Sequence, residues 1–195
     1  MYDMNKVIKG NPGYLDYKKK VEIIRTVIYF VLVAAVFFLG YSQAHTRLNM
    51  MTVVAVLGCL PASKSLVGVI TRFPYPSIAV IRADEIKGKT GNITAVYDMI
   101  ITSREKVMPV DCIVISGNTI FGYTNSEKVD LKYAATHIKG ILNQNQFPDV
   151  SVKILNNYTA FLARAEGLNS IAAVEKRDTK EMEERIKQVI LNISM

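Results

Sequence analysis

Histidine, cysteine and tryptophan are scarce in this chain of 195 residues. It has two histidines, two cysteines and no tryptophan. Zinc sites need several histidine or cysteine ligands at short, fixed spacings, and neither His45 and His137 nor Cys59 and Cys112 show such a spacing. Because Cys59 lies in a long apolar run and Cys112 in a predicted central strand, we expect no disulfide between them. The composition therefore argues against a zinc centre and a disulfide framework.

Common catalytic and nucleotide-binding motifs are also missing. The chain contains no Gly-rich phosphate loop followed by Lys-Ser or Lys-Thr, no Gly-x-Ser-x-Gly and no dinucleotide fingerprint. We interpret the KGKTG segment at 87–91 as a basic loop, since the leading glycine and preceding strand of a phosphate loop are absent. His137 is interpreted as a boundary residue, and Cys112 as a packing residue rather than a nucleophile. No cofactor is expected.

Acidic residues are few in the first part of the chain. Residues 1–73 hold nine Lys/Arg and three Asp/Glu, whereas residues 74–195 hold fifteen and fourteen, so most of the net charge of +7 lies in the N-terminal part. A nucleic-acid-binding domain would carry the excess on its own surface. The charge distribution therefore argues against nucleic acid as a partner.

Two long apolar runs, at about 23–41 and 50–70, are separated by a short polar segment. Each run is about long enough to cross a bilayer, which takes roughly 20 helical residues, and amphipathic periodicity is absent, as in lipid. A pair of helices inside a large globular core and a cleaved signal peptide are the alternatives. We favour a cytoplasmic segment at 1–22, a transmembrane hairpin at 23–73 and a soluble domain at 74–195.

Basic residues predict how this hairpin is oriented. They flank the two runs, whereas the connecting loop contains only Arg47 and His45. The positive-inside rule then places both termini and the soluble domain in the cytoplasm, with contact to anionic lipid as a secondary role. The residues interpreted as topology signals are Lys18, Lys19, Lys20, Arg25, Lys64 and Arg72.

The second run has features that bear on helix packing. Gly58, Ala62 and Ser65 form a stripe of small residues that allows a neighbouring helix to approach closely. That helix is either the first span or a second copy of the chain. Pro61 is expected to kink the span. Lys64 is interpreted as a side chain that extends to the membrane surface, with a pore role as the less favoured alternative.

From Pro74 onward the pattern predicts an α/β domain with a small mixed sheet and flanking helices. Residues 77–87 are predicted as a helix that brings Ile78, Ile81 and Ile86 to the core. Residues 93–101 are predicted as a strand with Asp98 on one side and alternate apolar residues on the other. An apolar central strand at 112–115, a type II′ turn at Gly117-Asn118 and a returning strand at 119–124 follow. The apolar side of the first strand comprises Ile93, Ala95, Tyr97, Met99 and Ile101.

Three helices and a further strand complete the domain. The strand at 150–154 follows a crossover helix and so has a parallel neighbour. The predicted helix starts are Ser126, then Asn156 or Asn157, and then Asp178 with Glu181 as a capping box. The inward set of the last helix is Met182, Ile186, Val189, Ile190 and Ile193.

This element order, with Asp111 before an apolar strand and a Gly-Asn hairpin after it, resembles the restriction-endonuclease-like core, in particular the nuclease-related domain. The resemblance covers roughly residues 93–155. It implies that Asp111 is the metal-binding aspartate of the family. The family motif continues with Glu-x-Lys on the next strand, but Thr124 and Ser126 stand at those places, so the resemblance implies a degenerate active site.

Two functions stay in view. The first is a membrane-anchored interaction or scaffold module without catalytic activity, which binds a protein partner or a second copy of itself. The second is an enzyme or ligand-binding domain in which Asp111, Asp98 or Glu85 coordinates a metal near the open end of the sheet. On the simpler interpretation Asp111 caps the start of the strand. The incomplete catalytic set favours the first.

Overall fold

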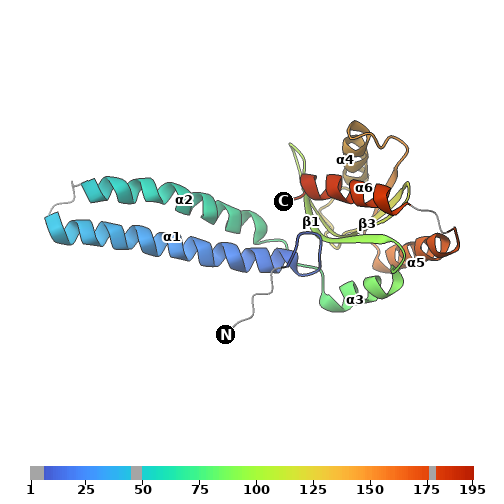
Figure 1. Ribbon diagram of the computed structural model, residues 1–195, viewed down its shortest axis with the longest axis horizontal. Coiled ribbons are helices and arrows are strands. Elements are labelled where there is room, and N and C mark those ends of the chain that lie inside the picture. Colours follow the sequence, from blue (N-terminus) through green and yellow to red (C-terminus); the bar gives the residue numbers. More distant parts are fainter. Residues whose placement is uncertain (1–6, 45–49, 176–178) are drawn as a thin grey trace. The chain divides into compact units, whose positions relative to one another are not determined.

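The computed structural model describes residues 7–44, 50–175 and 179–195, except for the side chains of Gln43 and Ala44. These residues divide into two compact units, drawn in Figure 1. One unit is a pair of helices within Leu15–Pro76, and the other joins the described residues up to Tyr14 to Ser77–Met195. The predicted class, a mixed α/β fold accompanied by two long apolar helices, is confirmed.

The helical unit consists of α1 (Tyr14–Ala44) and α2 (Met50–Arg72), which lie side by side (Figure 1). Both helices are long and apolar enough to cross a membrane. In the most apolar 18 residues of each, 11% are buried. A core helix of a soluble protein would bury most of these side chains, so the exposure favours a lipid environment. Pro61 lies inside α2, which continues through it.

The second unit is built on a four-stranded sheet in the order β1-β2-β3-β4. The strands are β1 (Thr94–Thr102), β2 (Val107–Ser116), β3 (Thr119–Tyr123) and β4 (Ser151–Leu155). The first three are antiparallel neighbours, and β4 lies parallel to β3 after a crossover. The sheet is therefore mixed, as predicted, and the apolar β2 is an internal strand.

Two pairs of helices cover the sheet. Helices α3 (Val80–Lys89) and α5 (Tyr158–Glu175) pack against one face, and α4 (Leu131–Gln144) and α6 (Lys180–Ile193) against the other. Neighbouring residues of β2 show why both faces must be covered: Val114 lies in the core under α3 and α5, and Ile113 in the core under α4 and α6. A strand that is apolar on both sides requires a layer on each.

The predicted alternation along β1 is wrong from Asp98 onward. Tyr97 lies in the core under α3 and α5, whereas Met99 and Ile101 lie in the core under α4 and α6. Asp98 has φ of 56°, in the left-handed region, so the backbone turns there and the following residues change face. Strict period-two alternation assumes extended backbone throughout, which Asp98 interrupts.

Helix starts are the other departures. Ile81 is 84% exposed and does not reach the core, because α3 begins at Val80 and turns Ala83 and Ile86 inward. Helix α4 begins after Asp130, whose carboxylate accepts a hydrogen bond from the Tyr133 amide, and not at Ser126. Asn157 caps α5 as predicted. Asp178 lies outside the described residues, and the residue before α6 is Thr179.

The segment before α1 packs on the free edge of β1. The carbonyl of Gly10 accepts a hydrogen bond of 2.8 Å from the Tyr97 amide, and Met195 N–H donates to the Ile100 carbonyl. Lys9 Nζ donates to the carbonyls of Leu191 and Ser194. Residues from both ends of the chain thus cover the edge of β1. Because they flank the α1–α2 hairpin, the hairpin begins and ends at one folded unit.

Candidate functional site

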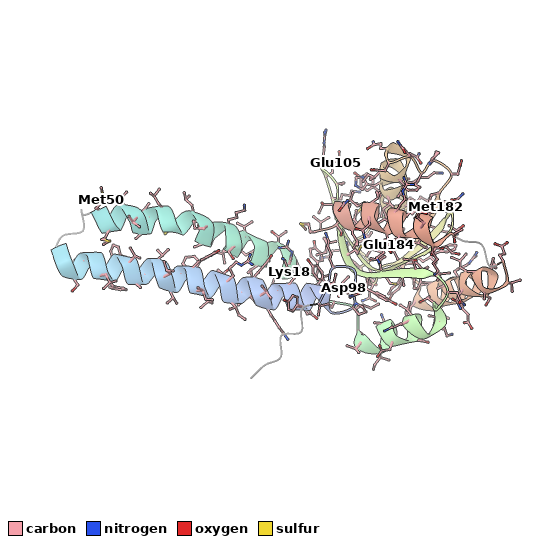
Figure 2. All side chains as sticks on the ribbon, viewed as in Figure 1. Lys18, Met50, Asp98, Glu105, Met182 and Glu184 are labelled. Carbon is pink, nitrogen blue, oxygen red and sulfur yellow. The ribbon has the colours of Figure 1, made fainter. Side chains whose placement is uncertain are left out.

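Asp98 and Asp111 occupy opposed positions of β1 and β2. The pairs on either side are Tyr97 with Cys112 and Met99 with Val110, so the register places the two aspartates across from each other. Asp98, labelled in Figure 2, is 2% exposed, and Asp111 is half-buried. Asp111 therefore lies within β2, which begins at Val107, and does not cap the start of the strand.

Each carboxylate holds a neighbouring loop. Asp98 Oδ1 accepts a hydrogen bond of 2.8 Å from the Ile78 amide, just before α3. Asp111 Oδ2 accepts one from the Asn125 amide, just after β3. Burial raises the pKa of the Asp111 carboxyl; the hydrogen bond from Asn125 opposes this rise and the nearby Asp98 adds to it. The two carboxylates thus each fix the backbone of a loop next to the sheet.

Arg82 lies near Asp111 and contacts two tyrosines. Arg82 Nη1 donates to the Tyr123 hydroxyl at 3.0 Å, and its guanidinium lies 5.0 Å from the centre of the Tyr158 ring. Tyr158 donates to Glu85 at 2.6 Å, and burial followed by this bond raises the pKa of its hydroxyl. Glu85 is thus hydrogen-bonded to Tyr158.

Thr124 and Ser126, at the predicted places of the family's glutamate and lysine, serve the backbone. Thr124 is fully buried, and its hydroxyl donates to the Pro109 carbonyl at 2.8 Å. The Ser126 amide donates to the same hydroxyl at 3.2 Å. Among the described residues there is no group of three histidine, cysteine, aspartate or glutamate side chains placed to hold a metal ion.

A separate cleft, of about 930 Å³, opens where β2 turns into β3. One wall is apolar and comes from α5, through Leu168, Ile171 and Ala172. The other wall is polar and includes the turn Gly117-Asn118. Ile171 is 52% exposed and is thus available for contact within the cleft.

The rim of this cleft is fixed by hydrogen bonds. The Asn92 carbonyl accepts a bond of 2.6 Å from Lys180 Nζ of α6, and the Asn92 amide donates at 2.7 Å to the side chain of Asn169 on α5. The backbone at Asn92 is thereby tied to both helices that border the cleft. A cleft held in this way is largely formed before any ligand binds.

No protein-family model, curated protein or solved structure matches this chain.

Glu183, which the sequence pattern did not indicate, anchors the cleft from below. It is 1% exposed and accepts hydrogen bonds from the Gly117 amide at 3.0 Å, the Thr94 hydroxyl at 2.8 Å and the Thr179 hydroxyl at 2.9 Å. Glu183 has helical spacing to the buried Ile186 and Ile190, and this spacing is the feature of the sequence that could have indicated an inward position. A charged side chain is usually solvated, so a pattern of apolar residues does not indicate Glu183 as an inward residue.

The predicted topology and packing residues lie in the helical unit. Ala62 is fully buried, Ser65 Oγ lies 2.8 Å from Thr26 Oγ1 of α1, and a Cβ added at Gly58 would come within 2.9 Å of Val33. The stripe thus faces α1 of the same chain. Arg72 Nη1 lies 2.8 Å from both carboxylate oxygens of Glu22, whereas Arg25 and Lys64 are exposed.

The remaining candidates are accounted for by packing. Cys112 is fully buried, and burial first, then Asp111 and Asp98, raise the pKa of its thiol, which disfavours the nucleophilic thiolate. His137 stacks on Tyr133, with ring centres 6.2 Å apart. His45 lies outside the described residues.

Proposed function

We propose that this protein is a membrane-anchored module that binds a partner protein at the cytoplasmic surface and has no catalytic activity. The α1–α2 hairpin spans the bilayer, and Lys18, Lys19 and Lys20 lie on the cytoplasmic side. The contact between Gly10 and Tyr97 supports an even number of crossings, since residues before α1 and after α2 fold into one unit. Both termini then lie on one side of the membrane.

The cleft beside the β2–β3 turn is the observation that carries the binding role. It combines an exposed apolar wall on α5 with backbone and amide groups of the turn. Such a combination suits a peptide segment, whose apolar side chains lie on one wall while its main chain bonds to the other. The described aspartates, by contrast, are occupied with loops of their own chain.

A matched pair of substitutions tests this role. Ile171→Glu places a charge in the cleft, and Ile81→Glu places one on α3, where Ile81 is 84% exposed and outside the cleft lining. Full-length protein and both variants are cross-linked in native membranes and captured, and associated proteins are quantified. We expect Ile171→Glu to lose a partner that Ile81→Glu retains. Equal capture by both variants would contradict the cleft as the binding site.

Self-association is the other form of partner binding. The mass of the purified protein in detergent, measured by light scattering after subtracting the detergent, distinguishes it from capture of a different protein. A dimer that Ile171→Glu dissociates would mean that the partner is a second copy of the chain. A monomer in all variants would leave a different protein as the partner.

A metal-dependent, nuclease-like or ligand-binding domain with a degenerate site is the second candidate function. The opposed positions of Asp98 and Asp111 favour it, because two carboxylates on neighbouring strands are a common start of a divalent-cation site. Calorimetric titration of the full-length protein with Mg²⁺ and with Mn²⁺ tests it, followed by nuclease assays. Binding that Asp111→Ala abolishes would favour this candidate, and its absence would remove it.

The orientation has its own test. An epitope placed after Met195 is exposed to protease in intact cells and again after the membrane is opened. Protection in intact cells, followed by digestion afterwards, is expected for a cytoplasmic C-terminus. Digestion in intact cells would reverse the proposed topology.

A further inference from the structure

A groove of about 430 Å³ lies between α1 and α2, near the end of the hairpin that joins the soluble unit along the chain. Helix α1 contributes Glu22, Arg25 and Tyr29, and helix α2 contributes Lys64 and Arg72. Arg25 and Tyr29 are four residues apart and so share one face of α1. The groove therefore gathers three basic side chains and one acidic side chain.

The charges in this groove do not balance. Glu22 is taken up by Arg72, whose Nη1 lies 2.8 Å from each carboxylate oxygen. Within the part of the chain that the structure describes, neither Arg25 nor Lys64 forms an ion pair. Two positive charges are thus left to face the groove without an acidic partner.

Contacts between the helices set these two charges at a similar level. The hydroxyls of Thr26 and Ser65 lie 2.8 Å apart, and these residues directly follow Arg25 and Lys64. Lys64 lies eight residues before Arg72, which is about 12 Å along a helix. If the hairpin spans the bilayer as proposed above, this level falls at the boundary between headgroups and hydrocarbon, where lipid phosphates lie within reach of long basic side chains.

We propose that this groove is a binding site for the phosphate of an anionic phospholipid, with Arg25 and Lys64 on either side of it. The acyl chains then follow the helix surface toward the middle of the span, where Leu57 and Leu60 are 59% and 68% exposed. A free phosphate would share the charge contacts but has no group for this apolar surface. The inference rests on the proposed membrane anchoring and gives the anchor a lipid preference.

Native mass spectrometry of the full-length protein in detergent tests the site. The protein is titrated with phosphatidylglycerol and, separately, with phosphatidylcholine of the same chains. The groove variant is Arg25→Gln with Lys64→Gln. The matched control is Lys18→Gln with Lys20→Gln, which removes two basic residues of the same flank that do not line the groove.

A direct charged contact to the lipid phosphate contributes about fivefold to affinity, so the groove variant, which loses two such contacts, should bind phosphatidylglycerol about 25-fold more weakly. The control should change by less than about threefold, because diffuse attraction to a membrane surface is absent in detergent. Arg25→Lys with Lys64→Arg keeps both charges and should retain binding, which separates loss of charge from misfolding.

Three outcomes would overturn the proposal: equal binding of the two lipids, equal loss in the control variant, or displacement of the lipid by inorganic phosphate at equal concentration. Extraction of native membranes with alkaline carbonate is carried out first. Release of the protein would overturn both the anchoring and the lipid site. Retention in the membrane without a preference for phosphatidylglycerol would overturn the lipid site alone.

Discussion

The carboxylate of Glu183 accepts a hydrogen bond of 3.0 Å from the backbone amide of Gly117, so that helix α6 holds the turn between β2 and β3. Gly117 has φ of 51°, which a glycine adopts at little cost. With Asn118 it forms the two-residue turn that the pattern predicted. The buried acid and the turn are one structural unit at the base of the cleft.

Glu183→Ala should destabilise the soluble unit by about 2 to 4 kcal/mol, because it leaves buried donors without an acceptor. Chemical unfolding of the full-length protein in detergent, followed by near-ultraviolet circular dichroism, measures this loss. The matched control is Glu181→Ala, since Glu181 is exposed on the same helix. Similar midpoints for the two variants would show that the Glu183 bonds contribute little.

Asp98 should tolerate asparagine or glycine better than alanine. Its φ of 56° costs an alanine roughly 1 to 2 kcal/mol, and alanine also removes the acceptor for the Ile78 amide. Asparagine keeps the acceptor and enters the left-handed region more readily. Unfolding midpoints for the three variants should therefore place alanine lowest. Equal stability of alanine and asparagine would contradict both the backbone argument and the role of the bond.

Asp111→Asn should raise stability at neutral pH. Burial raises the pKa of the folded carboxyl above its ordinary value of 3.8, so the folded state binds the proton more tightly than the unfolded state. The contribution of this group is then fully present below that value and is lost as pH rises through the folded pKa. Asparagine still accepts the bond from Asn125 and does not ionise.

Unfolding midpoints measured between about pH 4 and pH 7 check this sign. The gap between Asp111→Asn and the unaltered protein should grow as pH increases. A variant that is less stable at neutral pH would mean that Arg82 and the Asn125 amide more than offset the cost of burying the charge.

Gly58→Leu should loosen the helical hairpin without changing the mass of the protein in detergent. A Cβ at this position already comes within 2.9 Å of Val33, so a larger side chain must push α1 and α2 apart. Thermal unfolding of the helical signal measures the loosening, and light scattering measures the mass. Gly140→Leu is the control, because space is open around Gly140 on α4. A fall in mass for Gly58→Leu alone would favour an oligomer built on the stripe.

Periodic segments were predictable because burial alone determines their pattern. The helices and strands of the soluble unit appear in the predicted order, since apolar residues repeat at 3.6 or 2 residues along each element. The prediction for the first strand failed at Asp98. The backbone there has left-handed geometry, a local feature that the periodicity of apolar residues does not indicate. The start of α4 was misplaced because Ser126 and Asp130 are both good caps and only tertiary contacts choose between them.

The candidate sites were harder to predict than the elements. The cleft is made by the end of α5, the start of α6 and one turn, which are distant in sequence and polar or small in composition. Asp98 and Asp111 are both indicated by the sequence pattern, but their opposed positions depend on strand register. The groove between α1 and α2 depends in the same way on which faces of two uniformly apolar helices meet.

The hydrogen bonds of Lys9, which lies in the segment that covers the edge of β1, have a consequence for how the protein is made. Lys9 donates to the carbonyls of Leu191 and Ser194, which lie 182 and 185 residues later in the chain. Lys9 must therefore wait for these partners, with both hydrophobic helices already synthesised, until Leu191 and Ser194 have been made. Until then the outer edge of β1 is open to pairing with other chains. Synthesis of the proposed membrane hairpin and completion of the sheet edge are thus ordered in time, and a nascent chain that stalls before Leu191 keeps this edge uncovered.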